Sequence, residues 1–156
     1  MASIVDDRGY NQVFVKTKST EVRLHRRAEL IMSKMSNPAN KRVMEIGSGT
    51  GEVAYWIAEK LPVQVLATDL CVPFIEQSKE KYVLPNLRYE VLDFNKAEQF
   101  KNENFDYIIG NGILHHLYHH LDSALKNILN RNLNENYAIN VFLPISFFSR
   151  SRARRV

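Results

Sequence analysis

The sequence has few of the residues that mark secreted, membrane-bound or disordered proteins. It contains one cysteine, five prolines and six glycines in 156 residues. No apolar run approaches the roughly 18 residues that a membrane-spanning helix needs. The single cysteine, Cys71, excludes an internal disulfide, and the N-terminus carries early acidic residues in place of the apolar core of a signal peptide. We therefore predict a cytoplasmic protein with no membrane association.

Length and charge bound the domain organisation and the partners. A chain of 156 residues with 45% hydrophobic and 24% charged residues is long enough for one globular domain with one core. The net charge of +4 comes largely from the C-terminal segment SRSRARRV, so the rest of the chain is close to neutral. A basic tail of this kind is usually a solvated end. This distribution argues against nucleic acid as the main partner.

Short apolar runs alternate with amphipathic segments along the chain. The apolar runs predict strands at residues 42–46, 64–68, 87–92, 105–109 and 137–143. The amphipathic segments predict a first helix within residues 19–35, with Ser19 or Thr20 as its N-cap, and further helices at 52–60, 73–82 and 121–132. Strands separated by helices predict an α/β fold, a parallel sheet with helices on both faces. We expect the domain to cover residues 19–143, between an N-terminal segment, 1–18, and a basic tail, 144–156.

Polar residues stand where the predicted strands end. Glu45 is followed by a glycine-rich turn, Asp69 and Asp93 end the second and third strands, and a glycine-flanked Asn111 follows the fourth. In open parallel sheets, ligands bind outside the carboxyl ends of the strands, where the strand order reverses. We therefore expect these side chains to gather at one rim of the sheet.

The turn EIGSGTG, residues 45–51, is the strongest local motif. Its glycines are spaced G-x-G-x-G, whereas dinucleotide-binding turns have G-x-G-x-x-G. Bare backbone lets a ligand approach closely, although glycines also occur in such turns for packing alone. Glu45 would repel a pyrophosphate by roughly 3 kcal/mol, for charges about 6 Å apart at an effective dielectric constant of about 20. A ligand with a positive charge fits better, and Asp69 is placed to accept hydrogen bonds from a ribose.

A nucleoside with a cationic amino-acid tail suits both acids, and S-adenosylmethionine is such a molecule. Four motifs, EIGSGTG, Asp69 after VLAT, LDF at residues 92–94 and FDYIIGNGILHHL at 105–117, occur in this order. Together they resemble the class I S-adenosylmethionine-dependent methyltransferases of the small-molecule type, from about residue 20 to residue 143. The resemblance implies a Rossmann-like fold and a transferase that moves a methyl group from S-adenosylmethionine to a small-molecule acceptor by in-line displacement.

The resemblance also implies a set of site residues. The cofactor-binding residues would be Glu45, Gly47, Ser48, Gly49, Gly51, Asp69, Leu70, Asp93, Phe94 and Asn111. In this scheme Glu45, the glycines and Asn111 line the methionine part of the cofactor. Asp69 holds both ribose hydroxyls, Asp93 accepts from the adenine amino group, and the two apolar members pack near the adenine ring. The competing interpretation is that Asp69 and Asp93 are ordinary caps at strand ends.

The run HHLYHH, residues 115–120, raises two further possibilities. His115 and His119 have the spacing of zinc ligands on a helix, as do His116 and His120, but no third ligand is evident and we predict no metal site. The resemblance instead places His115 and His116 at the substrate pocket, as candidate catalytic bases. Packing or solvent exposure of these histidines is the alternative, since methyl transfer from a sulfonium needs no essential base.

The end of the chain departs from the family pattern. The family usually continues past its fifth strand with two more strands, whereas residues 144–156 are all that follow Leu143. The predicted fifth strand would then have an exposed edge. We expect a fragment or frameshift product of a longer enzyme. The alternatives are a natural minimal form, and a second copy or a partner chain that covers the edge. The second functional hypothesis is a non-catalytic S-adenosylmethionine-binding partner subunit.

Overall fold

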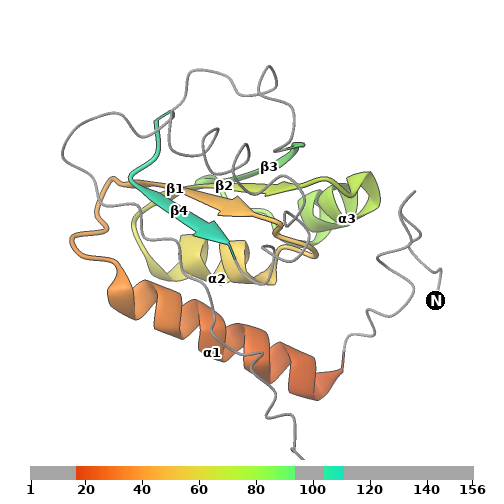
Figure 1. The fold of residues 1–156 in the computed structure, drawn as a ribbon, viewed down its shortest axis with the longest axis horizontal. Coiled ribbons are helices and arrows are strands. Elements are labelled where there is room, and N and C mark those ends of the chain that lie inside the picture. Colours follow the sequence, from red (N-terminus) through yellow and green to blue (C-terminus); the bar gives the residue numbers. More distant parts are fainter. Residues whose placement is uncertain (1–16, 94–103, 111–156) are drawn as a thin grey trace, which may run out of the picture.

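The computed structural model describes residues 17–93 and 104–110. In chain order, these residues form α1 (Lys18–Lys34), β1 (Arg42–Ile46), α2 (Glu52–Lys60), β2 (Gln64–Asp69), α3 (Val72–Lys81), β3 (Leu87–Val91) and β4 (Tyr107–Gly110). The strands form one parallel sheet in the order β3-β2-β1-β4 (Figure 1). The chain thus adds β2 and β3 on one side of β1, and then returns to place β4 on the other side.

Local sequence explains where the elements begin. The Oγ1 atom of Thr17 accepts a hydrogen bond from the N–H of Thr20 at 3.2 Å, so Thr17 is the N-cap of α1 rather than the predicted Ser19 or Thr20. Gly51, with φ of +80°, turns the chain into α2. Pro73 stands in the first turn of α3, where its missing N–H costs no hydrogen bond.

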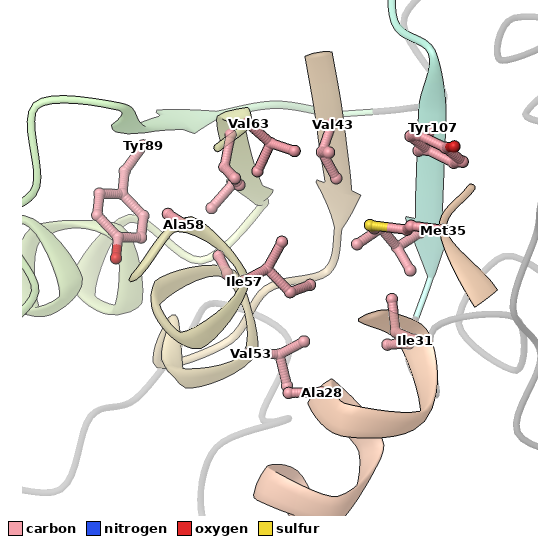
Figure 2. Close-up of a cluster of buried hydrophobic side chains, with 14 of the residues drawn as sticks. Ala28, Ile31, Met35, Val43, Val53, Ile57, Ala58, Val63, Tyr89 and Tyr107 are labelled. Atoms are coloured by element: carbon pink, nitrogen blue, oxygen red, sulfur yellow. The ribbon is translucent and has the colours of Figure 1, made fainter. Parts of the chain in front are cut away.

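One apolar cluster lies between the sheet and the three described helices (Figure 2). Its strand members are Val43, Val65, Ala67, Tyr89, Tyr107 and Ile109. They stand at alternate positions, and therefore on the same face of the sheet. Ala28 and Ile31 of α1, Val53 and Ile57 of α2 and Ile75 of α3 pack against them. The Tyr107 hydroxyl also donates to the carbonyl of Ser36, which ties β4 to the end of α1.

The predicted elements agree closely with the observed ones. The strand predicted at 42–46 and the helix predicted at 52–60 have the observed bounds. β4 begins at Tyr107 rather than at residue 105, because the side chain of Asp106 accepts a hydrogen bond from the N–H of Arg42 at 2.8 Å. Within 17–93 and 104–110, no helix is long and apolar enough to cross a membrane. The helix predicted at 121–132, the strand at 137–143 and the tail at 144–156 lie outside the described residues.

Candidate functional site

The strand order reverses beside β1, which has β2 on one side and β4 on the other. The glycine turn, residues 47–51, leaves the carboxyl end of β1 at this point. Ile46, the last residue of β1, is paired with Gly110, the last residue of β4. In open α/β sheets, the rim at such a reversal is where ligands bind. The fold therefore places the glycine turn at the position where a binding site is expected.

Most of the predicted cofactor residues lie together at this rim. Eight of them stand at or just after the carboxyl ends of β1, β2 and β3: Glu45, Gly47, Ser48, Gly49, Gly51, Asp69, Leu70 and Asp93. Hydrogen bonds join the glycine turn to β2, since the Gly49 N–H donates to Asp69 Oδ2 at 2.7 Å and the Ser48 N–H donates to the Thr68 carbonyl at 2.9 Å. The other predicted site residues, Phe94, Asn111, His115 and His116, lie outside the described residues.

Two glycines of the turn have different surroundings. Gly49 and Gly51 both have left-handed backbone, with φ of +55° and +80°. A Cβ atom on Gly51 would lie 2.8 Å from Ser78 Oγ and 3.0 Å from Tyr89 Cε1. A Cβ atom on Gly49 would meet no atom of the described residues within 4 Å. Gly51 is therefore needed for packing against α3 and β3, whereas Gly49 presents open backbone.

This difference predicts separate effects of two alanine substitutions. We expect Gly51→Ala to lower the free energy of unfolding by roughly 2 to 4 kcal/mol, since the added methyl group combines left-handed strain with overpacking. Gly49→Ala is the matched control and should cost about 1 kcal/mol, because only the strain applies. Urea denaturation of both variants measures the difference. Equal losses would show that the close contact at Gly51 does not matter.

Glu45 is a carboxyl group buried between the sheet and the helices. Its side chain is 1% exposed, and its Oε2 atom has no hydrogen-bond partner among the described residues. Burial raises the pKa of Glu45 from 4.5 to about 8, and the nearby Asp69 and Glu52 carboxyls also raise it. A hydrogen bond from the Ala54 N–H acts in the opposite direction and lowers the pKa. A buried carboxylate is costly unless a positive charge pairs with it. Glu45 is therefore suited either to carry a proton or to pair with a cationic ligand.

Asp69 connects the glycine turn to the segment after β2. Besides the bond from Gly49, its Oδ1 atom accepts a hydrogen bond from the N–H of Cys71 at 2.9 Å. Asp69 therefore also fills the local capping role that was the alternative interpretation of the sequence. Each carboxylate oxygen has more than one lone pair. The same atoms can thus accept a further hydrogen bond from a ligand hydroxyl.

Sequence reasoning missed two buried polar residues next to the turn. Glu52, the first residue of α2, is 3% exposed and accepts hydrogen bonds from Thr50 Oγ1 at 2.5 Å and from the Tyr82 hydroxyl at 3.3 Å. An acid directly after a glycine turn favours a helix N-terminus, and that signal was available. The hydroxyl of Tyr89 is buried and has no hydrogen-bond partner among the described residues. Three carboxyl groups, Glu45, Glu52 and Asp69, thus lie close to one turn.

Comparison with known protein families gives one match over more than half of the chain. The family described as "Methyltransferase domain" matches residues 43–134. A curated relative, the ribosomal RNA small subunit methyltransferase C of Buchnera aphidicola subsp. Cinara cedri, is 30% identical over 90 residues, which cover 57% of this chain and 26% of the relative. The chain therefore spans about a quarter of the length of that curated relative.

Solved structures show the same fold at low sequence identity. A chain of the Haloferax volcanii complex between the Trm112 methyltransferase activator and a methyltransferase matches with a TM-score of 0.64 and 16% identity, over 74% of this chain and 50% of that one. A TehB-like SAM-dependent methyltransferase from Corynebacterium glutamicum matches with a TM-score of 0.53 and 21% identity, over 73% and 67%. Phosphoethanolamine N-methyltransferase 2 from Haemonchus contortus, in complex with S-adenosyl-L-methionine, matches with a TM-score of 0.57 and 18% identity, over 79% and 28%.

Proposed function

Because the chain belongs to the methyltransferase domain family of class I S-adenosylmethionine-dependent enzymes, we propose that it binds S-adenosylmethionine at the glycine turn and transfers the methyl group to a small-molecule acceptor by in-line displacement. The observation that carries the proposal is Glu45, a buried carboxyl group with one unpartnered oxygen. It lies just before a turn whose backbone is open at Gly49. This combination favours a ligand that brings both a positive charge and close contact with the main chain.

The described residues fit this cofactor better than a dinucleotide. Its methionine end has an ammonium group, which suits Glu45, and its ribose has two hydroxyls, which suit Asp69. A pyrophosphate at the turn would instead meet the carboxyl groups of Glu52 and Asp69, and it would offer no positive charge to the buried Glu45. A pair of like charges costs roughly 3 kcal/mol at about 6 Å. The charge of the site therefore argues against NAD.

In this proposal the chain contributes binding and orientation. The methionine end is held by Glu45, Gly47, Ser48, Gly49, Gly51 and Asn111. Asp69 holds the ribose, and the adenine is held by Asp93, Leu70 and Phe94. The candidate base toward the acceptor is His115 or His116. When bound, S-adenosylmethionine supplies a methyl group that its positive sulfur has already activated. Much of the rate can then come from holding the acceptor in line with that group.

Calorimetric titration of the purified protein tests the cofactor. We expect S-adenosylmethionine and S-adenosylhomocysteine to bind with dissociation constants of roughly 1 to 100 μM, in the usual range of enzyme–substrate affinities. NADH is the control, and it should give no heat of binding. The proposal would be wrong if a folded sample bound NADH tightly and bound neither S-adenosylmethionine nor S-adenosylhomocysteine.

Transfer of a labelled methyl group tests the acceptor. We expect label from S-adenosylmethionine to appear in the small-molecule fraction of a cell extract. RNA is the second candidate acceptor, since the curated relative is a ribosomal RNA methyltransferase. Label in RNA alone would therefore contradict the small-molecule acceptor. Cofactor binding without label in either fraction would favour a non-catalytic subunit that works with a partner chain or a second copy.

A further inference from the structure

Two unpartnered polar atoms belong to one row of side chains beneath the glycine turn. Glu45, Ala67 and Tyr89 are paired across β1, β2 and β3, so their side chains project from the same face of the sheet. Ala67 lies between the other two and is fully buried, and its side chain is only a methyl group. Glu45 Oε2 and the Tyr89 hydroxyl are both buried without a hydrogen-bond partner among the described residues.

Tyr89 and Glu45 both face the beginning of α2. Figure 2 shows Tyr89 projecting from β3 into the layer between the sheet and the helices. A Cβ atom added to Gly51, the residue before α2, would lie 3.0 Å from Tyr89 Cε1, so the Tyr89 ring packs close to the start of this helix. Glu45 accepts a hydrogen bond from the N–H of Ala54, in the first turn of α2. Burial raises the pKa of the Tyr89 hydroxyl, and the nearby Glu45 carboxyl raises it further.

We propose that Tyr89 is a positioning residue of this site, whose hydroxyl donates a hydrogen bond to the ionised Glu45 carboxylate, directly or through one enclosed water. The inference rests on the proposed function, because a cationic ligand is what ionises Glu45. Buried polar groups nearly always have hydrogen-bond partners, and these two groups are complementary, one a donor and the other an acceptor. The bond would hold Glu45 in the orientation that the ligand's ammonium requires.

The other charged and titratable groups around Glu45 do not offer such a donor. The Ser48 hydroxyl is also buried without a hydrogen-bond partner among the described residues, but Ser48 follows β1 in the glycine turn and is not part of the row. Asp69 on β2 and Glu52 on α2 are acids that disfavour its ionisation. On β4, its pairing partner is the apolar Ile109. Tyr82, which follows α3, donates its hydroxyl to Glu52. Among the described residues, Tyr89 is thus the side chain in the row of Glu45 that has a hydroxyl to donate.

Tyr89→Phe tests the inference, because it removes one oxygen and keeps the ring that packs under the turn. We expect the pKa of Glu45 in the cofactor-free protein, followed by carboxyl carbon NMR, to rise by about one unit, since a hydrogen bond to the charged form is lost. Affinity for S-adenosylmethionine at neutral pH should fall about tenfold for the same reason. Tyr107→Phe is the matched control. It removes a hydroxyl that donates to the Ser36 carbonyl, at the amino end of β4 and away from the glycine turn, and it should leave both quantities unchanged.

A double variant separates positioning from a merely structural role. If Tyr89 acts through Glu45, then Tyr89→Phe has no further effect on affinity in a Glu45→Gln background, whereas an undiminished loss there overturns the inference. If Tyr89→Phe binds S-adenosylmethionine and the pKa of its Glu45 is not shifted, the inference about Tyr89 is wrong. The proposed function is then unaffected. A shifted titration in a protein that binds no adenosyl ligand supports the pair and rejects the proposed cofactor. If Tyr89→Phe does not fold, site-specific 3-fluorotyrosine at residue 89, a stronger donor, should lower the Glu45 pKa.

Discussion

Binding of S-adenosylmethionine should weaken at least about a hundredfold when Asp69 is replaced by alanine. In the proposed complex, Asp69 accepts hydrogen bonds from two ribose hydroxyls, and bonds to a charged group contribute about 1.5 to 3 kcal/mol each. The substitution also removes the 2.7 Å bond from the Gly49 N–H, which holds the glycine turn against β2. Both losses act on the same ligand. Calorimetric titration of folded Asp69→Ala measures the effect directly.

Asp106→Asn is a matched control for this experiment. Asp106 also accepts a backbone hydrogen bond, from the Arg42 N–H at 2.8 Å, and it pairs with Lys41 at 2.9 Å. It lies before β4, however, at the amino ends of the strands and away from the glycine turn. We expect this variant to lose some stability and keep its affinity. If both variants lost affinity equally, general destabilisation would explain the result and the ribose role of Asp69 would be wrong.

The sequence predicted those parts of the fold that local patterns determine. β1 and α2 were predicted with their observed bounds because an apolar run, a glycine turn and an amphipathic segment follow one another there. The start of α1 was placed too late, since Thr17 precedes the helical periodicity that sequence reasoning relied on. β4 was predicted to begin too early, because Asp106 bonds to Arg42, a residue far away in the sequence.

The chemistry of the site was only partly predictable for the same reason. The acidic residues at the strand ends could be found one strand at a time, and the topology then brought Glu45 and Asp69 to one rim. The burial of Glu45 could not be found in this way, because it depends on how β1 pairs with β2 and β4. The row that contains Tyr89 depends on a second register, between β2 and β3. Tyr89 was therefore missed, although the pairing places it in line with Glu45.

Replacing Glu45 with glutamine should make the protein more stable at neutral and alkaline pH. The pKa of Glu45 is about 8 in the folded protein, whereas the ordinary value of a glutamate, which applies to the unfolded chain, is 4.5. Folding stability from this group is therefore fully present below pH 4.5 and is lost as the pH rises through 8. At about 1.36 kcal/mol per pKa unit, the loss is roughly 3 kcal/mol at pH 7 and about 5 kcal/mol above pH 8. Glutamine does not titrate, so the variant avoids this loss.

The measurement is the free energy of unfolding of the wild type and of Glu45→Gln from pH 4 to pH 9. The difference should grow with pH by about 5 kcal/mol, on top of a constant cost of burying the amide. Glu59→Gln, on the exposed side of α2, is the control, and as a surface substitution it should change stability by no more than about 0.5 kcal/mol. The same Glu45→Gln variant should bind S-adenosylmethionine more weakly, because its neutral amide cannot pair with an ammonium. Higher stability with lower affinity would mean that the buried acid serves the ligand and not the fold. A difference in stability that does not change with pH would show that Glu45 is ionised in the free protein, and that its charge is balanced without a ligand.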